Sequence, residues 1–194
     1  MSALLSGKVV TSALALAMLA PAELLAHIAA DFSREEFPAK CLLVEQGQRA
    51  KKLFYIETGG CRGWFTTDAG KDVTINFGFE GSFVASMETL LAGEPSWYNV
   101  ETLEPTVVYS IDHPEFEELK TRSSYWQAVY VGYIEQRLLY YQHLFIARIK
   151  DSPASRYRAL LAQHPELIRR VPQHYLASFL GITAVSLSRI RGRK

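Results

Sequence analysis

The chain has 194 residues, of which 48% are hydrophobic and 21% charged, so it is an ordinary globular chain that can bury a core as one large domain or two small ones. Its net charge of +1 by itself points to no class of partner. The distribution is uneven: residues 147–194 hold ten Lys and Arg against two acidic residues, a net +8, while residues 1–146 hold eleven against eighteen, a net −7. A basic C-terminal block behind an acidic region is typical of a polyanion-binding module joined to another domain.

The two cysteines, Cys41 and Cys61, lie 20 positions apart without a Cys-x-x-Cys pair. This spacing fits neither a zinc site nor an iron–sulfur cluster, and two thiols in a chain of this size fit a reducing compartment better than a disulfide scaffold. We therefore interpret both as ordinary thiols, and we expect a cytoplasmic protein without a metal or other cofactor.

The N-terminal region contains an apolar run at residues 9–20, preceded by Lys8. With Ala15-Leu16-Ala17 as a small-residue cleavage site the run looks like a signal peptide, and 12 residues are too few to span a bilayer. A mis-set start codon explains the run as well, and so does a packed helix that continues through Pro21 as far as Ala30. The sequence leaves these alternatives open, and we expect no membrane partner.

Residues 37–111 change to short β-rich segments separated by turn signals such as Thr58-Gly59-Gly60 and Asp68-Ala69-Gly70-Lys71. The expected strands cover residues 41–44, 53–57, 63–67, 73–79, 98–103 and 106–111, with a helical insertion near residues 86–91. Strands of this length and spacing predict a small antiparallel barrel or jelly roll, in a chain of the α+β class.

Barrels of this kind can be metal-dependent enzymes, which need histidines clustered on the strands as ligands. The β-rich region contains no histidine, because the five in the chain are His27, His113, His143, His164 and His174. No Ser/His/Asp or Cys/His grouping stands out either. We therefore expect no metal site and no enzymatic activity.

A long periodic stretch runs from Tyr125 to Lys150, after a short helix expected at residues 115–120, and Ser123-Ser124 are suited to cap it. Large side chains recur in it at alternating steps of four and three, the spacing of a coiled-coil seam. We predict that this seam joins two chains in a homodimer through Trp126, Tyr130, Tyr133, Arg137, Tyr140, Leu144 and Ala147. The alternative is a helix packed wholly on its own chain.

The basic block ends in a helix-turn-helix pattern at residues 173–190, after a helix expected from Ser152-Pro153 to Gln163 and a short one at residues 166–170. Ala177 is small enough for a close helix crossing, and Gly181 is free to adopt a positive φ. Five apolar residues are spaced to face a shared core: Leu176, Leu180, Ile182, Leu187 and Ile190. The second helix of such a motif enters the major groove of DNA, so the expected DNA contacts are Gln173, Thr183, Ala184, Ser186, Ser188, Arg189, Arg191 and Arg193. The alternative is a helical hairpin that serves only as core.

The order of acidic barrel, long helix and C-terminal helix-turn-helix resembles the Crp/Fnr family of bacterial transcription regulators from Pro21 to the C-terminus. The segments most like a short subfamily with a cyclic-nucleotide-binding domain are Leu53-Phe54-Tyr55-Ile56-Glu57-Thr58-Gly59, Asn76 to Ser86, and Leu180-Gly181-Ile182-Thr183. The resemblance implies a cyclic-nucleotide-type barrel at residues 21–121, a dimerisation helix at residues 122–150 and a helix-turn-helix domain at residues 151–194. It also implies a homodimer on a palindromic site in double-stranded DNA, contact with RNA polymerase and an unidentified small-molecule effector.

The barrel departs from the family where a cyclic nucleotide would bind. Family members that bind one carry Gly-Glu for the ribose and, later, Arg-Ser or Arg-Thr for the cyclic phosphate; here Ser82 follows Gly81, and Ser96-Trp97 stands at the second place. A buried phosphate without an arginine would be an unpaired charge costing several kcal/mol, so cyclic AMP is not expected to bind in the usual mode. Trp97 and Tyr98 are expected to fill this region with aromatic bulk, in a pocket formed by Phe79, Gly81, Ser82, Phe83, Ser96, Trp97 and Tyr98.

The second helix of the motif departs from the family as well. Many relatives have Arg-Glu where this chain has Ala184-Val185, although Arg189 matches an arginine of the family. Ala and Val can contact only the methyl groups of thymine. Two functions remain: a homodimeric DNA-binding regulator, and a ligand- or partner-binding barrel whose basic tail docks on an acidic surface without reading DNA sequence.

Overall fold

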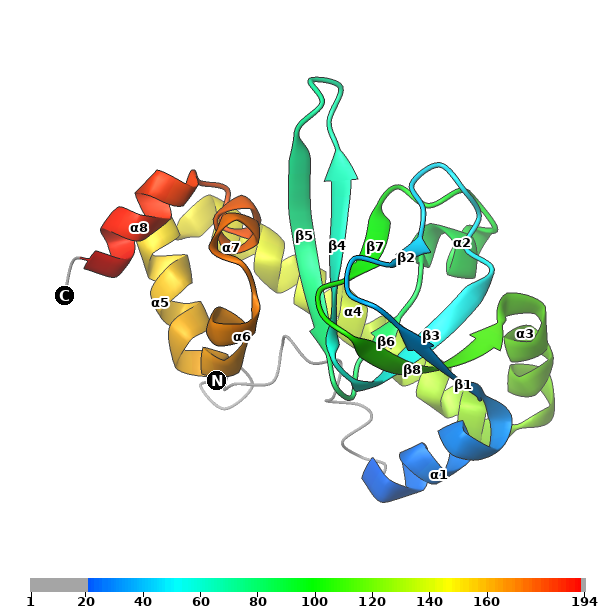
Figure 1. Cartoon of the computed structure of the whole chain (residues 1–194). Coiled ribbons are helices and arrows are strands. Elements are labelled where there is room, and N and C mark those ends of the chain that lie inside the picture. The colour runs from blue at the N-terminus through cyan, green and yellow to red at the C-terminus, as the bar shows by residue number, and fades with distance from the viewer. Residues whose placement is uncertain (1–20, 193–194) are drawn as a thin grey trace.

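The computed structural model describes residues 21–192, which form a β-barrel, a long helix and a helical lobe (Figure 1). Helix α1 (Pro21–Asp31) precedes the barrel. The barrel contains β1 (Ser33–Phe37), β2 (Leu42–Val44), β3 (Lys52–Thr58), β4 (Gly60–Thr66), β5 (Asp72–Phe79), β6 (Phe83–Val84), helix α2 (Met87–Ala92), β7 (Asn99–Thr102) and β8 (Thr106–Asp112).

Two four-stranded antiparallel sheets make the barrel, in the orders β1-β8-β3-β6 and β2-β7-β4-β5. Strands β4 and β5 pair from Gly60 opposite Phe79 to Thr66 opposite Asp72, and the tip of this hairpin projects beyond the barrel (Figure 1). The two sheets enclose a core of Val44, Phe54, Ile56, Cys61, Val84, Tyr98, Val100 and Val108. The fold is therefore the antiparallel jelly roll that the strand spacing predicted.

Both cysteines, Cys41 and Cys61, are free thiols in the structure. Burial in the barrel core raises the pKa of the Cys61 thiol to about 12. At neutral pH Cys61 is therefore an uncharged core side chain.

Helices α3 (His113–Arg122) and α4 (Ser124–Lys150) follow the barrel, and the helical lobe contains α5 (Pro153–Gln163), α6 (Pro165–Arg170), α7 (Gln173–Phe179) and α8 (Ala184–Gly192). Helix α4 begins where the side chain of Ser123 accepts a hydrogen bond from the backbone N–H of Trp126. Helix α5 begins in the same way at Ser152, with Pro153 in its first turn. These caps were the sequence signals for both helices.

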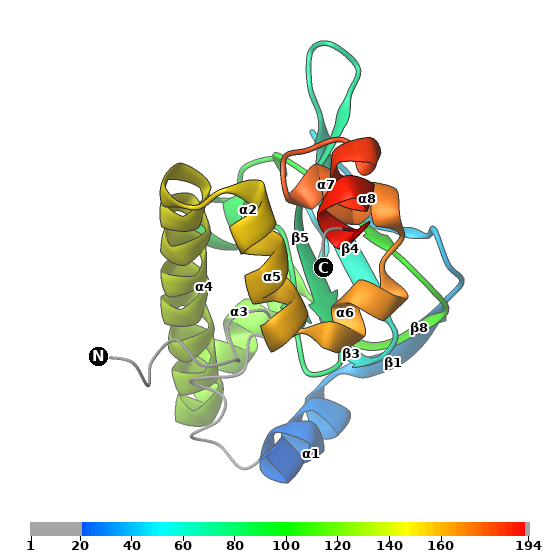
Figure 2. The same cartoon turned by 90° about the vertical axis from the view of Figure 1, so that its left-hand side faces the viewer.

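The first half of α4 is fixed to the barrel side of the molecule by aromatic packing. Trp126 is fully buried, donates its indole N–H to Asp31 at 2.7 Å and stacks on Phe32 with ring centroids 5.1 Å apart. Tyr133 meets Phe83 edge to face at 5.8 Å. Seen from the side, α4 stands at the edge of the molecule with one of its sides turned away from the barrel (Figure 2).

The sequence located most elements within a few residues but missed β1 and β6. Strand β1 reads Ser-Arg-Glu-Glu-Phe and pairs only with β8, and such a charged edge strand lacks an apolar alternation. Strand β6 has only two residues, too few for a pattern. The helical insertion is α2, whose N-cap Ser86 accepts a hydrogen bond from the backbone N–H of Thr89.

The apolar run at residues 9–20 lies outside the described residues, so its three interpretations stay open. Between residues 21 and 192, no helix is both long and apolar enough to cross a membrane.

Candidate nucleic-acid interface

Helices α7 and α8 are two short helices joined by a turn, at the place where the spacing predicted a helix-turn-helix. Gly181 adopts a φ of 70° in the turn, and the backbone N–H of Ile182 donates to the carbonyl of Ala177 at 2.9 Å. Leu176, Ala177 and Leu187 are buried where the two helices cross. The turn needs a residue that tolerates positive φ, and glycine does so without strain.

The N-terminus of α8 is held by side chains that the sequence had assigned to DNA. Thr183 accepts a hydrogen bond from the backbone N–H of Ser186 at 3.1 Å, and its hydroxyl also contacts the Ser186 hydroxyl at 3.0 Å. Gln173 reaches across from α7 and donates to the carbonyl of Ala184 at 3.3 Å. These polar groups therefore shape the start of α8 as well as facing solvent.

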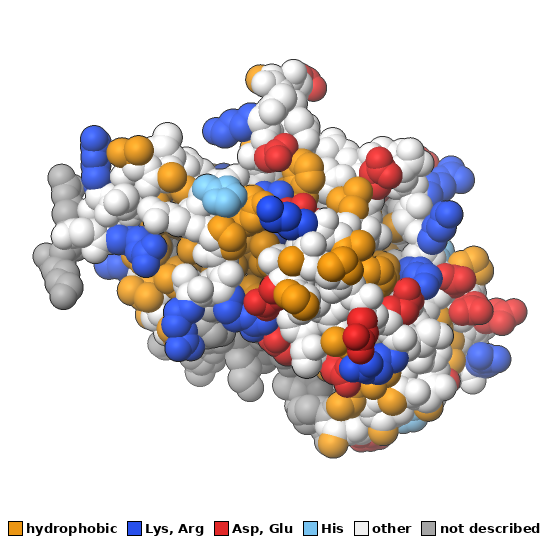
Figure 3. Space-filling model, viewed as in Figure 1, with side chains coloured by type: hydrophobic (Ala, Val, Ile, Leu, Met, Phe, Trp, Pro, Cys, Tyr) orange, Lys and Arg blue, Asp and Glu red, His pale blue; other side chains and the backbone are white. Residues whose placement is uncertain are grey.

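The outer face of α8 is open to solvent. Of the expected DNA contacts, Ser186 is half-buried and Arg193 lies outside the described residues; those that are exposed are Gln173, Thr183, Ala184, Ser188, Arg189 and Arg191. On the face shown in Figure 3, acidic side chains lie over the barrel together with Lys and Arg, whereas the charged side chains seen on the helical lobe are Lys and Arg. The exposed residues and the positive charge thus occur on the same lobe.

Two arginines of the basic block form hydrogen bonds to the turn between α7 and α8. Arg148, near the end of α4, donates to the carbonyl of Phe179 at 2.7 Å, and Arg156 on α5 donates to the carbonyl of Leu180 at 2.8 Å. Burial lowers the pKa of Arg148, and the nearby positive charge of Arg156 lowers it further. These cations satisfy the carbonyl groups at the C-terminus of α7, so a count of charge from the sequence overstates the cations available to a polyanion.

Helix α7 packs directly on strand β5 of the barrel. The hydroxyl of Ser178 accepts a hydrogen bond from the backbone N–H of Thr74 at 2.9 Å, and the rings of Phe77 and Phe179 lie 5.4 Å apart. The guanidinium of Arg62 lies 3.6 Å from the ring centroid of Tyr175 and pairs with Glu101 at 2.6 Å. The motif and the barrel therefore share one packed boundary, which sequence periodicity cannot reveal.

Arg170, at the end of α6, forms a second link to the barrel. It pairs with Glu80 at 2.8 Å, contacts Glu104 and donates to the carbonyl of Gly59 at 2.9 Å. Partial burial would raise the pKa of Glu80, but hydrogen bonds from Arg170 and from the backbone N–H of Gly59 hold it below its usual value. The carboxylate of Glu80 is thus charged and bound at neutral pH.

The residues expected to line a ligand pocket do not converge. Phe79 belongs to the core of the helical lobe, where Arg170 covers its ring, Phe83 packs beside α4, and Tyr98 lies inside the barrel. Ser82 lies in the turn after β5, where its hydroxyl accepts a hydrogen bond from the backbone N–H of Phe79, and Gly81, with a φ of 81°, makes that turn possible. Ser96 is buried in a hydrogen bond to the carbonyl of Tyr98.

The expectation that Trp97 fills the nucleotide region is wrong. Its side chain is 74% exposed, whereas the next residue, Tyr98, is buried and donates its hydroxyl to the carbonyl of Ala85 at 2.8 Å. Neighbouring residues of an extended segment point to opposite faces, so only one of the two can enter the barrel.

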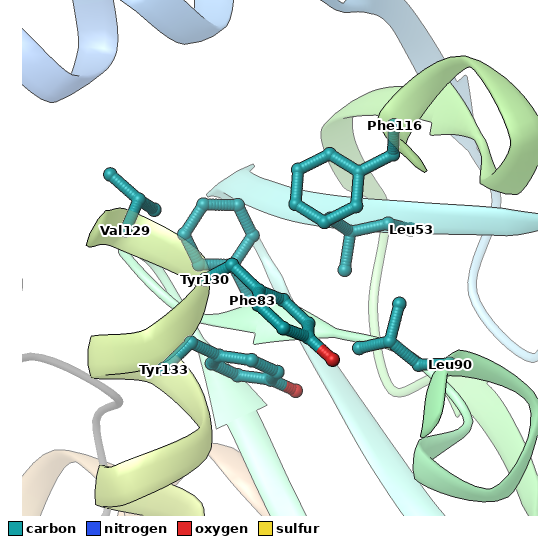
Figure 4. A pocket seen from close by; sticks show the side chains of 7 residues that line it. All are labelled: Leu53, Phe83, Leu90, Phe116, Val129, Tyr130 and Tyr133. Carbon is teal, nitrogen blue, oxygen red and sulfur yellow. The ribbon is translucent and has the colours of Figure 1, made fainter. Parts of the chain in front are cut away.

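A cavity of about 10 Å³ lies between the barrel and α4, with room for at most one water molecule (Figure 4). It is lined by Leu53, Phe83, Leu90, Phe116, Val129, Tyr130 and Tyr133.

The expected dimer seam needs correction. Trp126, Tyr133 and Tyr140 are buried within the chain's own fold, so they are not available to a partner, while Tyr130, Leu144 and Ala147 are half-buried. The error arose because both sides of α4 are apolar at steps of three and four. The opposite side of α4, which we call the exposed seam, has the same spacing of three and four residues. Its residues are exposed to solvent: Ala128, Val131, Glu135, Leu138, Gln142, Phe145 and Ile149.

Comparison with known families matches residues 34–123 to the cyclic nucleotide-binding domain. The matched region covers the barrel from β1 to the end of α3. A comparison with curated protein sequences gave no match. The barrel is thus similar to the cyclic nucleotide-binding domain, while Ser82, Ser96 and Trp97 occupy the places described above.

Solved structures extend the likeness over the whole arrangement of barrel, long helix and helical lobe. FixK2 from Bradyrhizobium japonicum superposes with a TM-score of 0.73 at 13% identity, covering 84% of this chain and 83% of that one. The regulator CLP from Xanthomonas campestris gives 0.69 at 18%, covering 87% and 89%. A protein of Eubacterium rectale assigned to the Crp/Fnr family of transcriptional regulators gives 0.69 at 12%, covering 84% and 78%. The chain therefore has the fold of the Crp/Fnr regulators, with a cyclic nucleotide-binding domain as its barrel.

Proposed function

We propose that the protein is a DNA-binding transcription regulator. Its reading head, meaning the recognition helix that enters the major groove of DNA, is α8. The observation that carries the proposal is an exposed α8 face, with Arg189 and Arg191, on a helix-turn-helix whose turn is held by Gly181 and by hydrogen bonds from two arginines. In such motifs the residues at the start of the second helix contact base edges, and cations near its end contact phosphates. Exposed Ala184 and Val185 offer only methyl contacts, so Arg189 is the strongest candidate for reading a base.

The proposal includes a homodimer, because a single helix-turn-helix reads one half-site and two-fold assemblies place two heads on one face of DNA. The exposed seam of α4 supports this assembly. Leu138, Phe145 and Ile149 lie on it with more than half of each side chain in solvent. Several large apolar side chains exposed on one helix face are typical of an interaction site. A second copy of α4 carries the same apolar side chains at the same spacing, so two copies can pack along this face.

The effector, if the regulator uses one, is proposed not to be cyclic AMP. Arg62 is the arginine buried in the barrel sheets, and it is paired with Glu101 and covered by Tyr175, while Ser96 and exposed Trp97 stand where a cyclic phosphate would need an arginine. Calorimetry with cyclic AMP and cyclic GMP should show no heat of binding. Micromolar binding of either nucleotide would refute the assignment of the pocket.

The regulator is proposed to act in the cytoplasm, with RNA polymerase as a further partner and without catalytic activity. A gel-shift experiment with fragmented genomic DNA at two salt concentrations tests the central claim. Specific reading predicts that most complexes are lost as salt rises while a few fragments survive, since phosphate contacts weaken steeply with salt. If no fragment survives, the runner-up, a ligand- or partner-binding barrel without sequence-specific DNA binding, is favoured.

A further inference from the structure

Arg137, near the middle of α4, is a cation without an acidic partner. No ion pair joins its guanidinium to any carboxylate among residues 21–192, and its Nε atom is buried without a hydrogen-bond partner there. Its contacts are to Tyr141, whose hydroxyl accepts a hydrogen bond from Nη2 and whose ring centroid lies 4.6 Å from the guanidinium carbon. The side chain is half-buried, and a charge partly removed from water without a counter-charge is unfavourable, so this arrangement calls for an explanation.

The groups around Arg137 are neutral donors. Burial raises the pKa of Tyr133 and of Tyr140, so neither phenol supplies negative charge at neutral pH. Both side chains are more than nine-tenths buried, and within the described part of the chain neither hydroxyl has a hydrogen-bond partner. They lie one turn before and about one turn after Arg137 on the same helix, so all three side chains share one face.

Tyr141 adds a third hydroxyl with the same property. Its oxygen already accepts hydrogen bonds from Arg137 and from the amide of Asn76, at 3.3 Å for the latter, which leaves its proton to be donated elsewhere. The amide of Gln136 is also buried without a partner among residues 21–192. One face of α4 therefore presents a guanidinium N–H and three phenol O–H groups that have no acceptor among residues 21–192.

We propose that this cluster of Arg137, Tyr133, Tyr140 and Tyr141 binds the oxyanion of a small molecule, a carboxylate or a phosphate. An oxyanion supplies the negative charge that Arg137 lacks and the acceptor oxygens that the three phenols lack. The site is built on the long helix, and the barrel serves as its wall through Asn76. The binding site itself does not depend on the proposed function. Only the regulatory role of the bound anion rests on it.

The position of the cluster suits such a role. Tyr133 belongs both to the cluster and to the lining of the apolar cavity between the barrel and α4 (Figure 4). Further along the same helix, Arg148 holds the turn of the helix-turn-helix. An anion bound at Arg137 therefore contacts the element that links the barrel, the exposed seam and the reading head.

The test is calorimetric titration of the full chain, in chloride buffer without DNA, with phenyl phosphate and with benzoate, which carry the two oxyanions on the same apolar body. At least one should bind, and the neutral analogue benzamide should not. Arg137→Met should weaken binding at least tenfold, and Tyr140→Phe several-fold, whereas Lys150→Gln, which removes an exposed positive charge at the end of the same helix and off the seam, should leave it unchanged. The Nε–H resonance of Arg137, assigned by its loss in Arg137→Met, should shift during the titration.

Two results would overturn the site: no binding of either anion, or equal binding by the wild type and Tyr140→Phe together with an unmoved Arg137 resonance. The comparison of the wild type with Tyr140→Phe remains possible even if Arg137→Met fails to fold, because Tyr140→Phe removes a single oxygen. The Arg137 resonance is then assigned by its loss in Arg137→Lys, which keeps the positive charge. These titrations contain no DNA, and the gel shifts contain no added anion. Failure of the anion site and failure of the DNA-binding proposal are therefore separate outcomes.

Discussion

The exposed seam of α4 leads to a quantitative prediction for Phe145→Glu. Phe145 is 67% exposed in the single chain. A phenylalanine buries roughly 200 Å² when covered, so each protomer offers about 130 Å² at this position. At about 25 cal/mol per Å² that area is worth about 3 kcal/mol per protomer. Because the residue occurs twice in a two-fold dimer, covering even half of it contributes about 3 kcal/mol to association, more than a hundredfold in the dimer dissociation constant.

Glutamate at this position removes the apolar contact and brings two carboxylates towards each other in a surface that excludes water. We expect Phe145→Glu to be monomeric in sedimentation equilibrium at concentrations where the wild type is a dimer, with an unchanged circular dichroism spectrum. Leu42→Glu on the barrel strand β2 is the matched control, since Leu42 is similarly apolar and exposed but lies off the seam. The reasoning is refuted if Phe145→Glu and Leu42→Glu dimerise equally, or if the wild type is a monomer throughout.

Three further predictions concern single side chains. Arg189→Ala should cost about 1 to 3 kcal/mol on the preferred DNA site and relax discrimination at one base pair, measured by selection from a randomised half-site; an even loss on all sequences would instead assign Arg189 to a phosphate. Glu80→Gln should destabilise the protein by at most about 1 kcal/mol at pH 7, since its pair with Arg170 is partly exposed to solvent. Because the folded-state pKa of Glu80 is lowered, the contribution is present above its unfolded pKa and is lost as pH falls through the folded value, so urea unfolding of the two proteins should converge in acid; a difference that persists there contradicts the pairing. Arg137→Met should raise the free energy of unfolding by about 1 kcal/mol or more in buffer without oxyanions, because it removes an uncompensated charge; destabilisation in urea titrations would show that the guanidinium is structural.

Local signals in the sequence determined the elements of this protein. Ser123 and Ser152 cap their helices as expected, because a cap depends on residues within one turn of it. Gly181 and the apolar spacing around it defined the helix-turn-helix for the same reason: a positive φ and a crossing of two adjacent helices involve few neighbours. The jelly roll followed from the turn signals, while the charged edge strand β1 did not.

The tertiary structure decided which surfaces remain free. Helix α4 has apolar side chains on two sides with the same spacing, so periodicity could not tell the side on which Trp126 and Tyr133 are buried within the chain from the side that carries Phe145. Charge in the sequence could not tell Arg148 and Arg170, which bind carbonyls and carboxylates of distant elements, from Arg189, which faces solvent. Each of these outcomes depends on contacts between residues far apart in the chain, and such contacts exist only once the barrel, the long helix and the helical lobe have packed together.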